Sequence, residues 1–354
     1  MRIRVLGICF SLFFYSCGSD DNVPETRSYQ MGFQNSAPRF DNLEIFLQSL
    51  NIWTVRADAA IISIEVPWEK LMAGENTVDH IVNNYKGLVE YYRSKNLTLW
   101  MYVDPQNGLD RTSDAVDLVA VGKSIAQPAM QEIYKRFVIV MDSVLKPEHI
   151  GLALETNLIR SAASPAIYNG VRQAANDAAV QLKLRKSDAK LSVSLQVDHA
   201  WGKLVGGSYE GVEQDFEDFP FLQEVGLSSY PYFGFQKPAD IPLDYYSRLL
   251  IGRDLPAFVA EGGWTSKSLT TPAGTLASSE QLQKEYIEYH HSLLNDIHAT
   301  AYFQLVFTDI DLDNLPSGVP DNIGYFSYLG LVDETLTPKP ALDAWDNLFK
   351  RKFK

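Results

Sequence analysis

The sequence has few cysteines and fewer positive than negative charges. Its 354 residues include two cysteines, Cys9 and Cys17, both near the N-terminus, so we expect no disulfide in the folded part. Lys and Arg number 31 against 44 Asp and Glu, which gives a net charge of −13. This balance argues against nucleic acid as a partner and against a polybasic membrane-binding surface, because both need clustered positive charge. A neutral or cationic partner fits better.

Motifs that mark several enzyme classes are also missing. The sequence has no GxGxxG or phosphate-loop pattern, which argues against a nucleotide-binding open sheet. It has no HExxH or paired-Cys set for catalytic zinc, and no GxSxG for a serine hydrolase. The alternating acids from Asp309 to Asn314 suggest a calcium loop, but they lack the Gly and Glu that an EF-hand requires. We therefore expect no metal and no cofactor.

The first residues have the pattern of an export signal. A basic start precedes a short apolar run from Val5 to Phe14, which is too short to span a membrane. FYSC, ending at Cys17, resembles a bacterial lipobox, and the GSDDN that follows resembles the export tag of surface lipoproteins in Gram-negative polysaccharide degraders. The resemblance implies a signal peptide over residues 1–17, a lipid on Cys17, and an anchored protein exposed on the outer membrane. A plain secretory signal is the alternative.

After a tether over residues 18–28, strand-like and helix-like segments alternate from residue 29 to 354. The expected strands are Tyr29–Phe33, Ala60–Val66, Leu97–Val103, Ile150–Glu155, Leu191–Val197, Gly226–Tyr232, Ala257–Glu261 and Thr300–Phe307. The expected helices are Asn42–Leu50, Asp79–Ser94, Gln127–Leu145, Ala166–Leu184, Phe216–Glu224, Leu243–Leu250, Ser279–Ile297 and Pro340–Lys350. Eight such units predict an α/β fold with a single (β/α)8 barrel. A doubly wound open sheet is the competing fold.

Two of the expected strands end in a glutamate. In LPAFVAEGGWTS, strict alternation places Glu261 on the same strand face as Ala257 and Val259, just before two glycines that permit a sharp turn. In IGLALETNL, the same logic places Glu155 with Ala153. These strands are the fourth and seventh, which lie nearly opposite each other in an eight-stranded barrel. Two carboxyl groups that flank one bond are what glycoside hydrolysis requires.

Polar and aromatic residues follow the ends of the other strands, where barrel enzymes place their functional groups. Glu65 and Asp104 follow the second and third strands. The candidate substrate-binding residues are Asn157, Asp198, His199, Tyr230 and Tyr232, with Trp68, Trp201 and Trp264 as stacking surfaces for sugar rings.

The layout resembles clan A of the retaining glycoside hydrolases. AEGGWTS resembles the nucleophile segment of the endo-β-1,4-galactanase and β-glucanase families, SSYPYF their sixth strand, and GLVDETLTPKPALDAW the tail that closes such barrels. The resemblance implies that Glu261 is the nucleophile, Glu155 the acid/base, and Tyr230 the hydrogen-bond partner of the nucleophile. One position departs from the pattern: Leu154 stands where the clan has an Asn that binds the sugar 2-hydroxyl, and Asn157 is the nearest substitute.

These observations lead to the hypothesis of a glycosidase that cleaves a β-linked polysaccharide or oligosaccharide by double displacement. The cycle calls for a raised pKa on Glu155. A surface glycan-binding lipoprotein without catalysis, on the same barrel, is the alternative that Leu154 favours. In either case we expect a carbohydrate ligand and a monomer.

Overall fold

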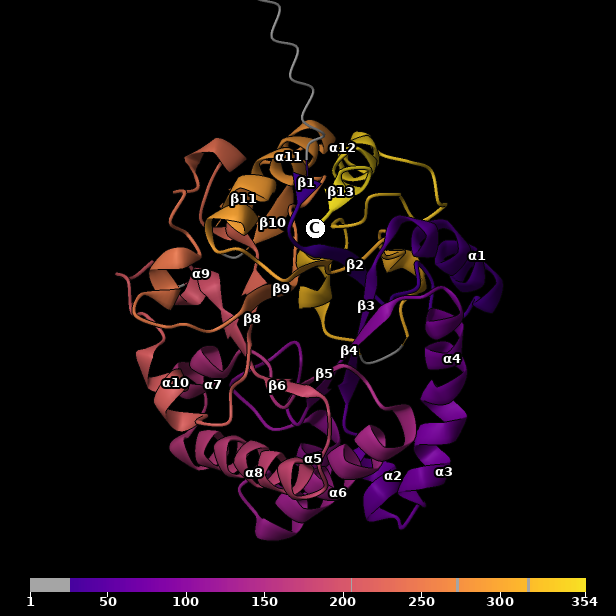
Figure 1. The fold of residues 1–354 in the computed structure, drawn as a ribbon, viewed down its shortest axis with the longest axis vertical. Coiled ribbons are helices and arrows are strands. Elements are labelled where there is room, and N and C mark those ends of the chain that lie inside the picture. The colour runs from indigo at the N-terminus through magenta and orange to yellow at the C-terminus, as the bar shows by residue number, and fades with distance from the viewer. Residues whose placement is uncertain (1–25, 205, 272–273, 317–318) are drawn as a thin grey trace, which may run out of the picture.

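The chain forms a closed barrel of parallel strands surrounded by helices (Figure 1). The computed structural model describes residues 26–354 except 205, 272–273 and 317–318. The expected signal peptide, Cys17 and most of the expected tether lie outside the described residues. The (β/α)8 prediction for the remainder is confirmed.

The barrel sheet contains nine strands in the order β6-β5-β4-β3-β2-β12-β9-β8-β7. The first and last strands of that order, β6 and β7, are separated in the sequence by Val193 alone. They act as one interrupted strand, so the sheet closes into an eight-stranded barrel. The N–H of Gly226, which lies on the next strand along the sheet, donates to Val193 O at 3.0 Å. The strands are β2 (Gln30–Gln34), β3 (Ala59–Glu65), β4 (Thr98–Asp104), β5 (His149–Gly151), β6 (Lys190–Ser192), β7 (Ser194–Gln196), β8 (Val225–Ser229), β9 (Ala257–Gly262) and β12 (Ala301–Gln304).

Helices cover the outside of the barrel (Figure 1). The α-helices are α1 (Leu43–Trp53), α2 (Trp68–Met72), α3 (Thr77–Ile81), α4 (Gly87–Ser94), α5 (Val116–Ala120), α6 (Pro128–Leu145), α7 (Thr156–Ala162), α8 (Pro165–Leu184), α9 (Val197–Ala200), α10 (Glu213–Asp218), α11 (Glu280–Asp296) and α12 (Pro340–Phe349). Five π-helical residues, Val82–Lys86, join α3 to α4. Two expected helices differ. The one expected over 216–224 begins and ends earlier, as α10, and the one expected over 243–250 is a 3-10 helix at Ser247–Leu250.

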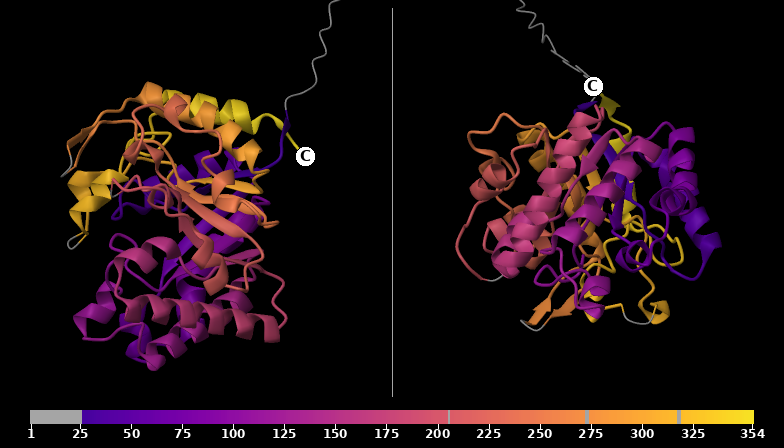
Figure 2. Two further views of the ribbon diagram at one scale, coloured as in Figure 1. Left: turned by 90° about the vertical axis from the view of Figure 1, so that its left-hand side faces the viewer. Right: turned by 90° about the horizontal axis from the view of Figure 1, so that it is seen from below.

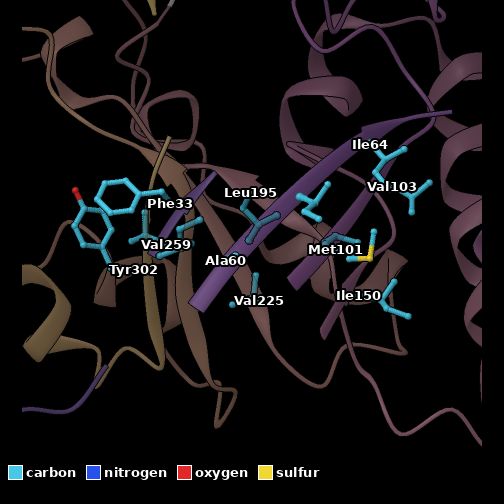
Figure 3. Close-up of a cluster of buried hydrophobic side chains, with 14 of the residues drawn as sticks. Phe33, Ala60, Ile64, Met101, Val103, Ile150, Leu195, Val225, Val259 and Tyr302 are labelled. Carbon is cyan, nitrogen blue, oxygen red and sulfur yellow. The ribbon is translucent and has the colours of Figure 1, made fainter. Parts of the chain in front are cut away.

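The barrel wall separates two hydrophobic clusters. The inner cluster consists of strand residues and Leu154, and its members are Ala59, Ile61, Trp100, Tyr102, Leu154, Phe258, Ala260, Ala301 and Phe303. The outer cluster combines the alternate residues of the same strands, such as Ala60, Met101 and Val259 (Figure 3), with helix residues such as Leu50 and Leu145. Alternation along each strand therefore decides which side chains fill the barrel and which ones hold the helices.

Both ends of the described chain meet at one end of the barrel. Strand β1 (Thr26–Arg27) pairs in parallel with β13 (Lys352–Phe353). The Arg27 guanidinium is buried, forms two hydrogen bonds to Asp58 at 2.6 and 3.0 Å, and lies over the rings of Phe349 and Phe353. Thr26 and Arg27 thus belong to the folded barrel and not to the tether expected over 18–28. Among the described residues, no helix combines the length and apolar character needed to cross a membrane.

A buried ion pair attaches the C-terminal tail to the barrel. Lys339 Nζ lies 2.5 Å from Asp309 Oδ1 and also donates to Ser266 Oγ and Gly330 O, both at 2.9 Å. Burial raises the pKa of Asp309 to about 6, although Lys339 acts in the opposite direction. Asp309 therefore serves as an internal anchor for the tail. No group of three His, Cys, Asp or Glu side chains suited to a metal occurs among the described residues.

Replacing Lys339 with methionine should leave the Asp309 carboxyl buried without a cation. Because the loss of one partner of a buried ion pair costs about 3–5 kcal/mol, we expect Lys339→Met to lower the free energy of unfolding by about this amount. Urea unfolding followed by fluorescence measures it, with Lys183→Met, at an exposed position of α8, as the control. Equal unfolding midpoints in the two variants would contradict a stabilising role for the pair.

Candidate active site

A cleft of about 430 Å³ opens at the C-terminal ends of the barrel strands. Both glutamates singled out in the sequence, Glu155 and Glu261, line it, together with Tyr230. Glu65, Asp104 and Arg111 complete its charged lining, and the remaining wall is largely apolar. The two glutamates are thus brought together in one cavity of a size typical of small-molecule sites.

A β-bulge places Glu261 in the cleft. Val259 belongs to the outer cluster and Ala260 to the inner one, so strict alternation would turn Glu261 outward. The pairing of β8 with β9 shifts at this point: Leu227 pairs with Val259, but Ser228 pairs with Glu261. The extra residue on β9 restores the inward direction. The expectation that Ala257 and Val259 share a face with Glu261 was therefore wrong, although Glu261 does point inward.

The two glycines after Glu261 are required by their surroundings. Gly262 and Gly263 have φ angles of 151° and 153°. A Cβ on Gly262 would lie 2.2 Å from Ser229 O, and one on Gly263 would lie 2.6 Å from Gln304 Nε2. No other residue fits the turn, which confirms the expectation from the sequence that the glycines permit a sharp change of direction.

Glu155 reaches the cleft by a different departure from strand geometry. Strand β5 ends at Gly151, and Glu155 stands before α7 with φ 51° and ψ 46°, the left-handed conformation. Left-handed backbone at a residue with a side chain costs about 1–3 kcal/mol and is concentrated at functional sites. Leu154, which stands where the clan A pattern has an Asn, lines the cleft beside it.

Arg111 connects two carboxylates of the cleft. Its Nε donates to Glu155 Oε2 at 3.0 Å, and its Nη1 donates to Asp104 Oδ2 at 2.6 Å. All three side chains are buried. Sequence reasoning missed Arg111, because it lies in the loop after β4 and outside any motif.

A chain of hydroxyls also joins the two glutamates beneath the cleft. The backbone N–H of Glu155 donates to Ser194 Oγ at 2.9 Å, and Ser194 Oγ lies 3.3 Å from Ser228 Oγ. The Ser228 hydroxyl in turn forms a hydrogen bond to the Glu261 carboxylate. The positions of the two acids are therefore fixed relative to each other through β7 and β8.

The electrostatics of the pair are dominated by burial. Burial, and then the negative charge of Glu155, raise the pKa of Glu261 to about 7, while Arg111 and hydrogen bonds from Tyr230 and Ser228 act in the opposite direction. The group with the raised pKa is thus Glu261, whereas the catalytic cycle expected from the sequence called for a raised pKa on Glu155.

Tyr230 is held against Glu261 by Asp198. The Tyr230 hydroxyl donates to Glu261, and the Tyr230 backbone N–H donates to Asp198 Oδ2 at 2.6 Å. Asp198 also accepts a hydrogen bond from the Tyr245 hydroxyl at 2.5 Å and is fully buried. Burial raises the pKa of Asp198 to about 6. Asp198 does not line the cleft and acts on the site by positioning Tyr230.

The other residues predicted to bind substrate lie outside the cleft lining. The Asn157 amide is used by the Gln196 backbone, donating to its O at 2.9 Å and accepting from its N–H at 2.8 Å, so Asn157 does not replace the missing Asn. His199 Nε2 lies 2.7 Å from Ser161 Oγ, and burial lowers the pKa of His199. The Tyr232 hydroxyl donates to Tyr325 O at 2.9 Å.

The tryptophans predicted as platforms do not line the cleft. Trp68 and Trp264 are each 1% exposed, and Trp264 donates to Ser278 Oγ. Trp201 is partly buried, donates to Tyr245 O and lies under the Arg248 guanidinium. The aromatic rings that line the cleft are instead those of Phe40, Tyr230 and Phe326. Phe40 and Phe326 carry no signal in the sequence that separates them from core phenylalanines.

The chain resembles known proteins in structure but not detectably in sequence. No family model and no curated protein matches it. The structure is similar to an exo-β-1,4-mannosidase from Opitutaceae bacterium strain TAV5, with a TM-score of 0.65 and 14% identity over 93% of this chain and 62% of that one. It is also similar to a β-glucosidase from Thermotoga maritima in complex with glucoimidazole, with a TM-score of 0.63 and 11% identity over 94% of this chain and 100% of that one.

A third similar structure is a family 5 glycoside hydrolase from Bifidobacterium longum in complex with Manβ1-4GlcNAc. Its TM-score is 0.58, with 12% identity over 91% of this chain and 78% of that one. The chain spans less than two thirds of the length of the mannosidase. At these identities the likeness concerns the fold alone: the chain shares its barrel fold with these three proteins.

Proposed function

We propose that the protein is a retaining glycosidase for β-linked oligosaccharides or polysaccharides. The observation that carries the proposal is the meeting of Glu155 and Glu261 in one cleft, with Tyr230 donating to Glu261. Each carboxylate reaches the cleft through an irregular backbone: a bulge in β9 for Glu261 and a left-handed conformation for Glu155. Such departures at both positions favour a functional pair over two solvated strand ends.

The proposed cycle has two displacements. In the first, Glu261 attacks the anomeric carbon while Glu155 protonates the glycosidic oxygen, so that the bond to the leaving sugar breaks and a glycosyl ester forms on Glu261. In the second, Glu155 takes a proton from water as the water attacks the anomeric carbon and releases Glu261. Arg111 occupies Oε2 of Glu155, so Oε1 is the atom assigned to proton transfer.

The charge of the cleft favours a neutral sugar. Four carboxyl groups line it, those of Glu65, Asp104, Glu155 and Glu261, against the single guanidinium of Arg111. With one proton on the Glu155–Glu261 pair, three negative charges still face one positive charge. An anionic sugar would meet repulsion in a partly desolvated site.

We also propose a lipid anchor on Cys17, which places the protein on the surface of the outer membrane. The position of Thr26 supports this arrangement, because β1 lies at the start of the barrel strands and the cleft lies at their ends. In the side view of Figure 2, the C-terminus, next to β1, lies at the opposite end of the barrel from the hairpin that follows β9. A chain tethered there would present its cleft away from the membrane.

The central test is replacement of either acid by its amide. We expect Glu261→Gln and Glu155→Gln each to lower kcat on the best substrate of a panel of aryl β-glycosides and β-glycans by about 10³-fold or more. Glu210→Gln is the matched control, because Glu210 is exposed and pairs with His199 outside the cleft. Tight glycan binding with no turnover on any member of the panel would favour the glycan-binding protein instead.

The pH dependence of the reaction provides a second test. Glu261 must be ionised to attack the anomeric carbon, so its pKa of about 7 predicts that kcat/KM falls by about tenfold per pH unit below that value. The Tyr230 hydrogen bond lowers the pKa of Glu261, so Tyr230→Phe should raise that pKa and move the acid limb to higher pH. Tyr232→Phe, which loses a hydroxyl bonded to Tyr325, should leave the profile unchanged. An acid limb that Tyr230→Phe does not move would contradict the assignment.

The charge argument predicts the order of substrates. At low ionic strength we expect kcat/KM on an aryl β-glucuronide to be about 100-fold below that on the matching β-glucoside or β-mannoside, whichever is the better substrate. Stopped assays that measure release of the same aryl group from all three glycosides provide the comparison. A glucuronide that is cleaved faster than both neutral glycosides would refute the argument.

A further inference from the structure

The segment from Gln34 to Phe40, which follows β2, forms one wall of the cleft. Gln34, Asn35, Ser36, Ala37 and Phe40 all line it. None of them has a place in the double displacement described above. Two backbone hydrogen bonds fix the segment: Asn35 N–H donates to Ile61 O at 3.2 Å, and Asp311 N–H donates to Pro38 O at 2.9 Å. The wall is therefore preformed and does not need to be ordered by a ligand.

Three consecutive side chains of this wall each contain one buried atom that lacks a hydrogen-bond partner among the described residues. Gln34 Oε1, Asn35 Oδ1 and Ser36 Oγ are buried atoms without a partner among the residues that the structure describes. Buried polar atoms are nearly always paired in folded proteins, and a run of unpaired ones in a cleft calls for an explanation. Because these three atoms have no partner among the described residues, they would lose no hydrogen bond if the side chains turned toward a ligand in the cleft. Sugar hydroxyls, which both donate and accept, would supply the missing partners.

Phe40 adds an apolar face to the same wall. Its side chain is 54% exposed, whereas the tryptophans expected as platforms are buried elsewhere or lie outside the cleft. An exposed aromatic ring beside the cleft loses little entropy on binding and offers a flat surface for the C–H face of a sugar. Glu65, at the end of the neighbouring strand β3, also lines the cleft and accepts a backbone hydrogen bond from Gly108.

We propose that residues 34–40 form a second sugar subsite beside the catalytic pair, with Phe40 as its stacking surface and Gln34, Asn35 and Ser36 as its hydroxyl partners. The sheet order places β2 two strands from β9, which carries Glu261, and three strands from β5, which precedes Glu155. Because the leaving sugar departs on the side of the acid Glu155, the subsite lies on the glycone side. The substrate is then a β-linked chain with at least two sugars on its glycone side. This inference rests on the proposed glycosidase function.

The test compares a nitrophenyl β-monoside with the nitrophenyl β-bioside of the same sugar, chosen as the sugar that the panel identifies. The bioside should have the higher kcat/KM. We expect Phe40→Ala to lower kcat/KM about tenfold on the bioside, chiefly through KM, and less than twofold on the monoside. Asn35→Ala should act in the same direction. Leu43→Ala is the matched control, because Leu43 is 68% exposed on α1 and does not line the cleft.

The outcomes separate the subsite from the enzymatic proposal. If the enzyme turns over its substrates but Phe40→Ala does not lower kcat/KM on the bioside, or lowers it equally on both substrates, the subsite is overturned and the glycosidase proposal is unaffected. If no substrate turns over, titration calorimetry with the biosides replaces kinetics. Binding that Phe40→Ala weakens and Leu43→Ala does not would support the subsite while the glycosidase fails, and binding that neither variant changes would overturn the subsite.

Discussion

The site depends on two local breaks in an otherwise regular barrel. A regular β9 would turn Glu261 toward the helices with Val259, and the bulge opposite Ser228 directs it into the cleft instead. Glu155 reaches the same cavity from a left-handed residue beyond the end of β5. Both irregularities cost free energy that the surrounding hydrogen bonds offset, including those of Ser194 and Ser228. The rest of the barrel is the rigid frame that keeps them in place.

The balance of carboxylates and the Arg111 guanidinium in the cleft determines the electrostatic environment of Glu155 and Glu261. Without Arg111, the cleft would hold four carboxyls and no cation among its lining residues. The guanidinium forms ion pairs with Asp104 and with one oxygen of Glu155, and burial raises the pKa of Glu261 to about 7. The proposed double displacement starts with the nucleophile ionised and the acid protonated. The similar solved structures bear on the fold alone.

The sequence was informative where regular periodicity decides the structure. The eight strand regions and most helices follow from apolar alternation and helical spacing, and the rim position of Glu155 and Glu261 follows from the barrel rule. The period-2 rule predicted the wrong neighbours for Glu261, because a bulge is set by tertiary pairing and not by local pattern. Arg111 was missed for a related reason: it lies seven residues after Asp104 in an irregular loop, and only the folded loop returns it to Glu155.

The aromatic residues show why composition is a poor guide to a binding surface. Trp68 and Trp264 follow strand ends, as binding residues would, yet they are buried because a large ring next to a barrel rim first serves to seal the core. Phe40 is 54% exposed in the loop between β2 and α1, although a backbone hydrogen bond at Pro38 and side-chain contacts of Arg39 with Asn314 and Asp311 hold that loop in place. A ring that the fold leaves uncovered beside unpaired polar atoms is the better candidate for contact with a ligand, and that criterion needs coordinates. Under the proposed function, recognition therefore resides in the loop wall, and catalysis at the two irregular backbone positions of Glu155 and Glu261.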